Sequence, residues 1–206
     1  MQQLFDEIRK FHKWADEQEP QIGEWDSWYG EWEKIRILFG QFLNQTDCEQ
    51  WGDEQFSEIL YIIARDNEAE GLADLVAEQE HVLLFLAEKA LTYYDIDTRW
   101  QLADRLQFCN QREEAERLLI RYVQDTEEYV NRRSLMALAA IQSKETESYC
   151  IRAWERDCYG EWQEYQRIAV LHALAGIQSD LLTQYINLAK EDGRKWLVQA
   201  ALDIEA

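Results

Sequence analysis

The sequence predicts an all-α fold, a right-handed α-α superhelix of about 11–12 helices arranged as a solenoid. The segment Ala137–Ile141 (ALAAI) returns as Ala173–Ile177 (ALAGI), and self-similarity at this period is typical of stacked helical repeats. Apolar residues recur at helical spacing along the chain, whereas the period-two alternation of a half-buried strand is absent. The single proline and eight glycines argue against long linkers or disorder.

The first part of the chain predicts five helices that lack a clear repeat. The apolar and aromatic residues follow i, i+3, i+4 and i+7 spacing, and the expected helices span 2–17, 25–43, 54–65, 68–78 and 80–93. We interpret 1–92 as diverged N-terminal helical hairpins or a cap, because the terminal repeats of solenoids are usually atypical.

The clearer repeats occupy 93–206. One leucine anchors each first helix, and these anchors are Leu106, Leu138, Leu174 and Leu202. An aspartate precedes each of these helices, where its carboxylate suits a turn or N-cap: Asp97, Asp125, Asp157 and Asp192. Second helices are expected between the anchors at roughly 112–123, 145–155 and 179–190. We therefore expect a single domain over 1–206.

The repeat positions also follow a known pattern. Asp125 is followed by Val130, Arg132 and Ala137–Ala139, and Arg167 is followed by Ala169 and Ala173–Ala175. In these positions residues 93–206 resemble the HEAT-repeat superfamily, including the short bacterial HEAT-like repeats. The first-helix proline common in that family is absent, and the subfamily is not identified. The resemblance implies a curved scaffold that holds a partner on its concave face.

The chain is strongly acidic, and the acids are unevenly spread. It has 41 acidic and 21 basic residues, which gives a net charge of −20. Residues 1–92 hold 21 of the acids and 7 of the bases, and the stretch 45–80 holds eleven acids against Arg65 alone. A surface of this sign repels phosphate and anionic membranes, and it attracts a basic protein.

These charges predict a protein partner of basic character, with no binding of nucleic acid or membrane. An alternative is that the acids only keep the protein in solution. The candidate partner-binding acids are Asp47, Glu49, Asp53, Glu54 and Glu58.

Two segments interleave aromatic and acidic residues. The first, 24–33, includes Trp25 and Trp28 and is either a core stripe or an exposed aromatic anchor ringed by acids. The second includes Tyr159 and Trp162 and falls where the turn between repeats is lengthened, and here too core and surface interpretations compete. Candidates opposite the apolar stripe of the second helices are Glu114, Arg117, Arg121, Glu147, Arg152 and Glu155.

Motifs of enzymes and cofactor sites are missing from the sequence. The glycines are isolated, no HExxH or GxSxG motif is present, and the four cysteines form no CxxC pair, so we expect no cofactor and no metal. We also expect a cytoplasmic protein, because the chain shows neither a signal peptide nor an apolar run of ~20 residues.

The leading hypothesis is a non-enzymatic, acidic protein-binding scaffold. A concrete version is an immunity or inhibitor protein that blocks a basic nuclease toxin by mimicking phosphate charge. The alternative is a HEAT-like enzyme or lyase accessory, related to the alkylpurine DNA glycosylases or to the bilin lyases. The sequence leaves the oligomeric state open.

Overall fold

The structure is a computed structural model, and it describes residues 2–206. Twelve α-helices and four short 3₁₀-helices make up the described chain, which contains no strand. The predicted all-α class is therefore confirmed. No helix within these residues combines the length and the apolar character that crossing a membrane requires.

The chain divides into two compact units, Met1–Arg105 and Leu106–Ala206. The division falls inside the region expected to hold the clearer repeats, since that region is predicted to begin at residue 93. The helix that carries Asp97 consequently packs within unit 1. We describe each unit by itself.

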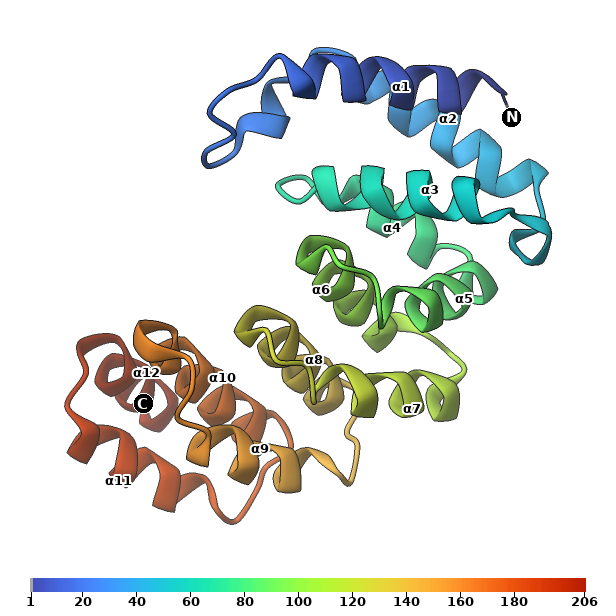
Figure 1. Cartoon of the computed structure of the whole chain (residues 1–206). Helices are drawn as coiled ribbons and strands as arrows, with labels where there is room; N and C mark the ends of the chain where they lie inside the picture. Colours follow the sequence, from blue (N-terminus) through green and yellow to red (C-terminus); the bar gives the residue numbers. More distant parts are fainter. Residues whose placement is uncertain (1) are drawn as a thin grey trace. The chain divides into compact units, whose positions relative to one another are not determined.

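Unit 1 contains the first six α-helices and two 3₁₀-helices (Figure 1). Helix α1 packs on α2 and α3, α4 packs on α2 and α5, and α6 packs on α3, α4 and α5. The bounds are α1 (Gln2–Asp16), η1 (Trp25–Trp28), α2 (Trp32–Gln45), η2 (Cys48–Gln50), α3 (Asp53–Arg65), α4 (Gly71–Ala77), α5 (Glu80–Ala90) and α6 (Ile96–Arg105).

The predicted helix at 25–43 is wrong at its start. Residues 25–28 form η1, Tyr29 is extended, and α2 begins only at Trp32. The break allows Tyr29 and Trp32 to pack on the buried ring of Phe11, with centroid distances of 5.0 and 5.1 Å. The indole N–H of Trp32 also donates to the carbonyl of Asp26 over 2.8 Å. Burial of this aromatic cluster offsets the helical hydrogen bonds that are lost at residues 29–31.

Two other helices begin later than predicted, where the expected starts were 68 and 179. Helix α4 begins at Gly71, because Glu70 is left-handed (φ 54°) and the Asp66 carboxylate accepts the N–H of Leu72 over 2.8 Å. Helix α11 begins at Leu182, because Ser179 belongs to the turn that ends the preceding helix. In both cases side-chain and backbone hydrogen bonds in a turn replace the first helical turn.

Unit 2 contains the remaining helices (Figure 1). Helix α10 packs on both α8 and α12, so these three form one row, and α7, α9 and α11 pack against members of that row. This pairing matches the expected first and second helices. The bounds are η3 (Leu106–Phe108), α7 (Arg112–Tyr122), α8 (Glu128–Ala140), α9 (Thr146–Glu155), η4 (Gly160–Trp162), α10 (Gln163–Gly176), α11 (Leu182–Asp192) and α12 (Lys195–Glu205).

The sequence echo is also a structural repeat. Helices α8 and α10 end in left-handed glutamines, Gln142 (φ 59°) and Gln178 (φ 53°). The next N–H, from Ser143 or Ser179, then bonds back to the anchor carbonyl of Leu138 or Leu174, over 3.1 and 2.9 Å respectively. This is the 6→1 bond of a Schellman motif, which terminates a helix.

The four anchor leucines do not share one environment, which corrects the predicted alignment of the last repeat. Leu106, Leu138 and Leu174 are fully buried, but Leu202 is 47% exposed. The face of α12 that packs on α10 and α11 carries Leu197, Ala200 and Ala201 instead.

The aspartates expected before each helix do not all lie in turns. Asp125 and Asp157 do lie between helices, and Asp125 accepts the N–H of Glu127 over 2.9 Å. Asp192 is the last residue of the preceding helix, α11, and accepts the N–H of Arg194 over 3.4 Å. Asp97 lies inside α6, where its carboxylate accepts the indole N–H of Trp100 over 3.0 Å. The preceding Asp95 caps this turn instead, because its carboxylate accepts the N–H of Asp97 over 3.0 Å.

Candidate protein-binding site

The acids expected to bind a partner cluster where η2 leads into α3. Asp47, Glu49, Asp53 and Glu54 are all exposed. Asp47 caps η2 by accepting the N–H of Glu49 over 3.1 Å. Asp53 and Glu54 lie in the first turn of α3, where the positive end of the helix dipole favours carboxylates. The local sequence therefore holds four negative side chains together at the surface.

These four carboxylates form no ion pair with a basic side chain among the described residues. Farther along the acidic stretch the situation differs. Asp66 pairs with Arg36 at 2.9 Å, and Glu70 and Asp74 pair with Arg105 at 2.6 and 2.8 Å. Within the stretch 45–80, the acids at the start of α3 thus keep their negative charge, whereas arginines from α2 and α6 neutralise three of the acids beyond its end.

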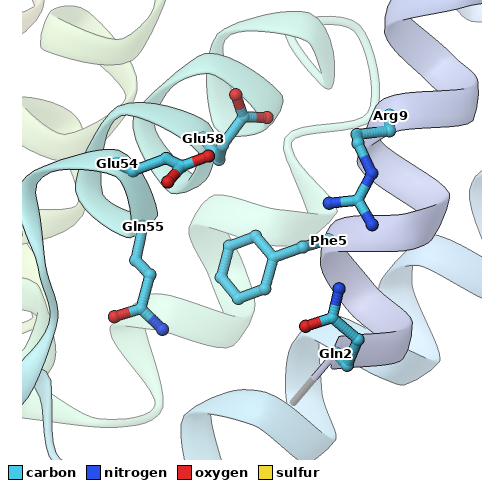
Figure 2. Close-up of a pocket in the computed structure, with 6 residues that line it drawn as sticks. All are labelled: Gln2, Phe5, Arg9, Glu54, Gln55 and Glu58. Atoms are coloured by element: carbon cyan, nitrogen blue, oxygen red, sulfur yellow. The ribbon is translucent and has the colours of Figure 1, made fainter.

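A pocket of about 330 Å³ lies beside this charge, between α1 and α3 (Figure 2). Helix α1 contributes Gln2, Phe5 and Arg9, and α3 contributes Glu54, Gln55 and Glu58. Figure 2 shows the Phe5 ring projecting between the two helices, with Arg9 on one side and the two glutamates across from it. The pocket combines one aromatic side chain, Phe5, with charged and polar groups around it, and pockets that anchor a partner's side chain use both kinds of group.

Glu58 joins the two helices at the edge of this pocket. Its Oε2 lies 2.9 Å from Nε2 of His12 on α1. The His12 ring stacks on Tyr61, with a centroid distance of 4.1 Å and an interplanar angle of 15°. Burial raises the pKa of Tyr61 to about 12, so its hydroxyl stays protonated at neutral pH. We name the group formed by Asp47, Glu49, Asp53, Glu54 and Glu58 the α3 acidic surface.

The two tryptophans predicted as anchors differ in their environment. Trp25 is buried and stacks on Trp14 with a centroid distance of 5.8 Å, which supports the core interpretation for that residue. Trp28 is 72% exposed, which leaves it accessible to a partner. Both lie in η1, and the neighbouring Asp26 lines a pocket with Arg65 at the C-terminal end of α3. The axis of α3 extends about 18 Å, and the α3 acidic surface begins at its other end. The structure therefore does not bring the two tryptophans into that surface.

Three of the second-helix candidates lie on α7 of unit 2. Glu114 and Arg117 are half-exposed and pair with each other at 2.8 Å, and Arg121 is exposed. The Glu114–Arg117 pair satisfies its own charges, and exposed pairs of this kind contribute little to stability.

Two of the α9 candidates, Arg152 and Glu155, are also exposed, whereas Glu147 is half-buried and accepts a hydrogen bond from the Ser179 hydroxyl. The Arg152 guanidinium lies over the ring of Tyr149, 5.0 Å from its centroid. Arg152 also lines a pocket of about 240 Å³ together with Asn131 and Arg156, so α9 presents a small basic feature within an acidic protein.

In the lengthened turn before α10, Tyr159 and Trp162 differ in their exposure to solvent. Tyr159 is half-buried, its hydroxyl accepts a hydrogen bond from Arg156, and burial raises its pKa. Trp162 is 55% exposed, and its ring lies 5.8 Å from that of Tyr165. The surface interpretation therefore fits Trp162, and the packed interpretation fits Tyr159.

The pocket residues Gln2, Phe5 and Arg9 were missed as site residues by sequence reasoning. The apolar spacing of the first helix places Phe5 on its core stripe, yet Phe5 is only half-buried. The spacing of these three residues puts them on one face of α1, but the sequence does not indicate that this face meets α3.

The cysteines are free thiols. Cys48, Cys109 and Cys150 are buried and Cys158 is exposed. Burial raises the pKa of Cys150 to about 12, which keeps it in the unreactive thiol form. Within residues 2–206 the structure contains no group of three or more His, Cys, Asp or Glu side chains placed to hold a metal ion.

Comparison of the chain with known families and with curated proteins finds no matching family model and no matching protein.

Proposed function

We propose that this chain is a non-catalytic binder of a basic protein partner, acting through the α3 acidic surface. The observation that carries the proposal is the set of exposed acids at 47–54 that have no basic partner within the described structure. An inhibitor or immunity role, in which the acids take the place of phosphate groups before a basic nuclease, fits this charge arrangement.

We expect the exposed acids and the pocket to contribute to binding in different ways. Each exposed ion pair contributes only about 0.2–1 kcal/mol. A cluster of like charges instead raises the association rate of an oppositely charged partner and orients it on arrival. Lasting affinity requires a buried anchor, and the pocket formed by Phe5 and the neighbouring polar groups supplies a place for one.

We also propose that the helices form a HEAT-like superhelical scaffold in a cytoplasmic protein. The repeated helix endings at Gln142 and Gln178, together with the row α8–α10–α12 in unit 2, support a repeat architecture. In such a scaffold each helical pair holds its neighbour in place, so a rigid surface is available to the partner.

The test is a capture experiment with two variants of equal net charge. The surface variant carries Asp47→Asn, Glu49→Gln, Asp53→Asn, Glu54→Gln and Glu58→Gln. The control variant carries five amide substitutions at exposed acids elsewhere: Glu17, Glu19, Glu113, Glu161 and Asp180. Each protein is used as bait in lysate of its source cells, and captured proteins are quantified by mass spectrometry.

We expect wild type and control to retain the same basic protein, and the surface variant to lose it. Equal retention by both variants would show that total charge, and not this surface, governs binding. Retention of no specific protein by the wild type would remove the proposal and favour the enzymatic alternative.

A further inference from the structure

A second pocket in unit 1 holds a buried carboxylate with a free oxygen. Asp26 is 2% exposed, lines a pocket of about 270 Å³, and has an Oδ1 atom without a hydrogen-bond partner. Buried polar atoms without partners are rare, because such an atom loses its bonds to water and gains none in exchange. The free oxygen therefore marks a position where a donor from a ligand would be stabilised.

The two arginines of this pocket are already neutralised. Arg36 donates to Asp66 over 2.9 Å, and the second oxygen of that carboxylate accepts the N–H of Leu72. Arg65 donates to Asp95 and lies 3.9 Å from a carboxylate oxygen of Asp97. Neither guanidinium is thus an unpaired charge that would repel a cation.

The remaining lining favours a positive ligand. Asp26 and Glu68 are the carboxylates of this pocket that form no ion pair with its arginines. Tyr29 and Trp32 also line it, and aromatic rings attract cations through their negative faces. An anion is the competing occupant, since the Nε atoms of both arginines are buried without an acceptor.

We propose that this pocket binds a compact organic cation, an ammonium or guanidinium group, whose N–H is accepted by Oδ1 of Asp26. The same chemistry is offered by a free amine or guanidine and by a lysine or arginine side chain of a protein. The site lies at the opposite end of α3 from the α3 acidic surface, and it goes beyond the function proposed above without depending on it.

The proposal implies a specific pH dependence. Burial raises the pKa of Asp26 to about 6, against the opposing effects of Arg65 and of the backbone amides of residues 26 and 27, while Asp97 raises it further. The charged or titratable groups that face it are Arg36 from α2, Arg65, Asp66 and Glu68 from α3 and the turn after it, Asp97 from α6, and Tyr29 from its own segment. A cation binds the ionised carboxylate, so affinity should fall about tenfold between pH 7.5 and pH 5.

The experiment is an NMR titration of the ¹⁵N-labelled full chain. The reporters are the backbone amides of Asp26 and Ser27 and the indole N–H of Trp32, which donates to the Asp26 carbonyl. The cationic probes are methylguanidine and N-acetyl-arginine methylamide. The uncharged probe is N-acetyl-citrulline methylamide, and the anionic probe is acetate. The variants are Asp26→Asn and, as a control at an exposed acid of unit 2, Glu113→Gln.

We expect saturable shifts with the cationic probes, none with the citrulline probe, a loss of at least about tenfold in affinity in Asp26→Asn, and no change in Glu113→Gln. Equal or tighter binding of the arginine derivative would identify a protein side chain as the source of the cation, and binding of methylguanidine alone would identify a free small molecule. Shifts with acetate but not with the cations would overturn the proposal, as would unchanged affinity in Asp26→Asn. The pH dependence of the wild type tests the proposal independently of that variant's folding.

Discussion

Ser143 and Ser179 occupy the same place in two successive repeats of unit 2 and make the same two contacts. Each hydroxyl donates to a glutamate on the second helix of the preceding pair, Glu116 on α7 or Glu147 on α9. Each also accepts an N–H two residues ahead, over 3.1 Å. Each serine therefore stabilises its own turn and connects that turn to the preceding helical pair.

This equivalence predicts that replacing either serine destabilises the protein by the same amount. Ser143→Ala and Ser179→Ala should each lower the free energy of unfolding by about 1–2 kcal/mol, because each leaves a carboxylate without its hydroxyl partner. Urea unfolding would measure both, with Ser57→Ala on the exposed face of α3 as the control. A cost at one serine and none at the other would contradict a shared structural role.

Asn131 and Gln166 connect α8 to α10 through a buried hydrogen bond of 2.8 Å. Gln166→Ala should lower the free energy of unfolding by about 2–3 kcal/mol, since it opens space in the core and leaves the Asn131 oxygen unpaired. A double-mutant cycle with Asn131→Ala isolates the pair, and we expect a coupling of at least about 0.5 kcal/mol. Purely additive effects would show that the hydrogen bond contributes nothing beyond packing.

Asp192 should contribute stability that disappears in acid. Hydrogen bonds from Arg194, with a further contribution from the charge of Arg167, lower its pKa to about 2. A carboxyl with a depressed pKa in the folded state stabilises the protein above its unfolded pKa of about 3.9, and the contribution is lost as the pH falls toward 2. Asp192→Asn should therefore lower the free energy of unfolding by about 2 kcal/mol at pH 7 and by much less at pH 2.5. Urea unfolding at both pH values would measure this difference. Equal costs at the two pH values would contradict this linkage.

The contribution of Asp26 to stability should depend on pH with the opposite sign. Its pKa is raised to about 6 in the folded state, so the protonated form favours folding, and this stability is lost as the pH rises through 6. Asp26→Asn should raise the free energy of unfolding at pH 7.5 by about 1–3 kcal/mol and have little effect at pH 4. Destabilisation at pH 7.5 would show that the ionised carboxylate has partners that stabilise it. A gain in stability combined with lost cation binding would be the trade-off typical of a functional site.

Local sequence was enough to predict the helical class and most helix positions. The apolar spacing in α3, α7 and α9 placed their bounds to within a residue, because each helix has one stripe that packs inward. The echo of Ala137–Ile141 predicted that α8 and α10 are equivalent, and the structure extends the equivalence to the turns that follow them.

Features that depend on distant parts of the chain were not predictable. The break between η1 and α2 depends on Phe11 of another helix. The neutralisation of Glu70 and Asp74 depends on Arg105 from α6, so a count of charge along the sequence overestimated the acidic surface beyond the end of α3. The pocket beside Phe5 exists only because α1 packs on α3.

The salt dependence of partner binding tests the central proposal most directly. The dissociation constant of the captured basic protein would be measured from 0.05 to roughly 0.5 M NaCl for wild type, surface variant and control variant, because exposed charges are screened beyond ~8 Å at physiological ionic strength. We predict a steep loss of affinity with salt for wild type and control, and a clearly flatter dependence for the surface variant. The same slope in all three proteins would contradict the assignment of binding to Asp47, Glu49, Asp53, Glu54 and Glu58.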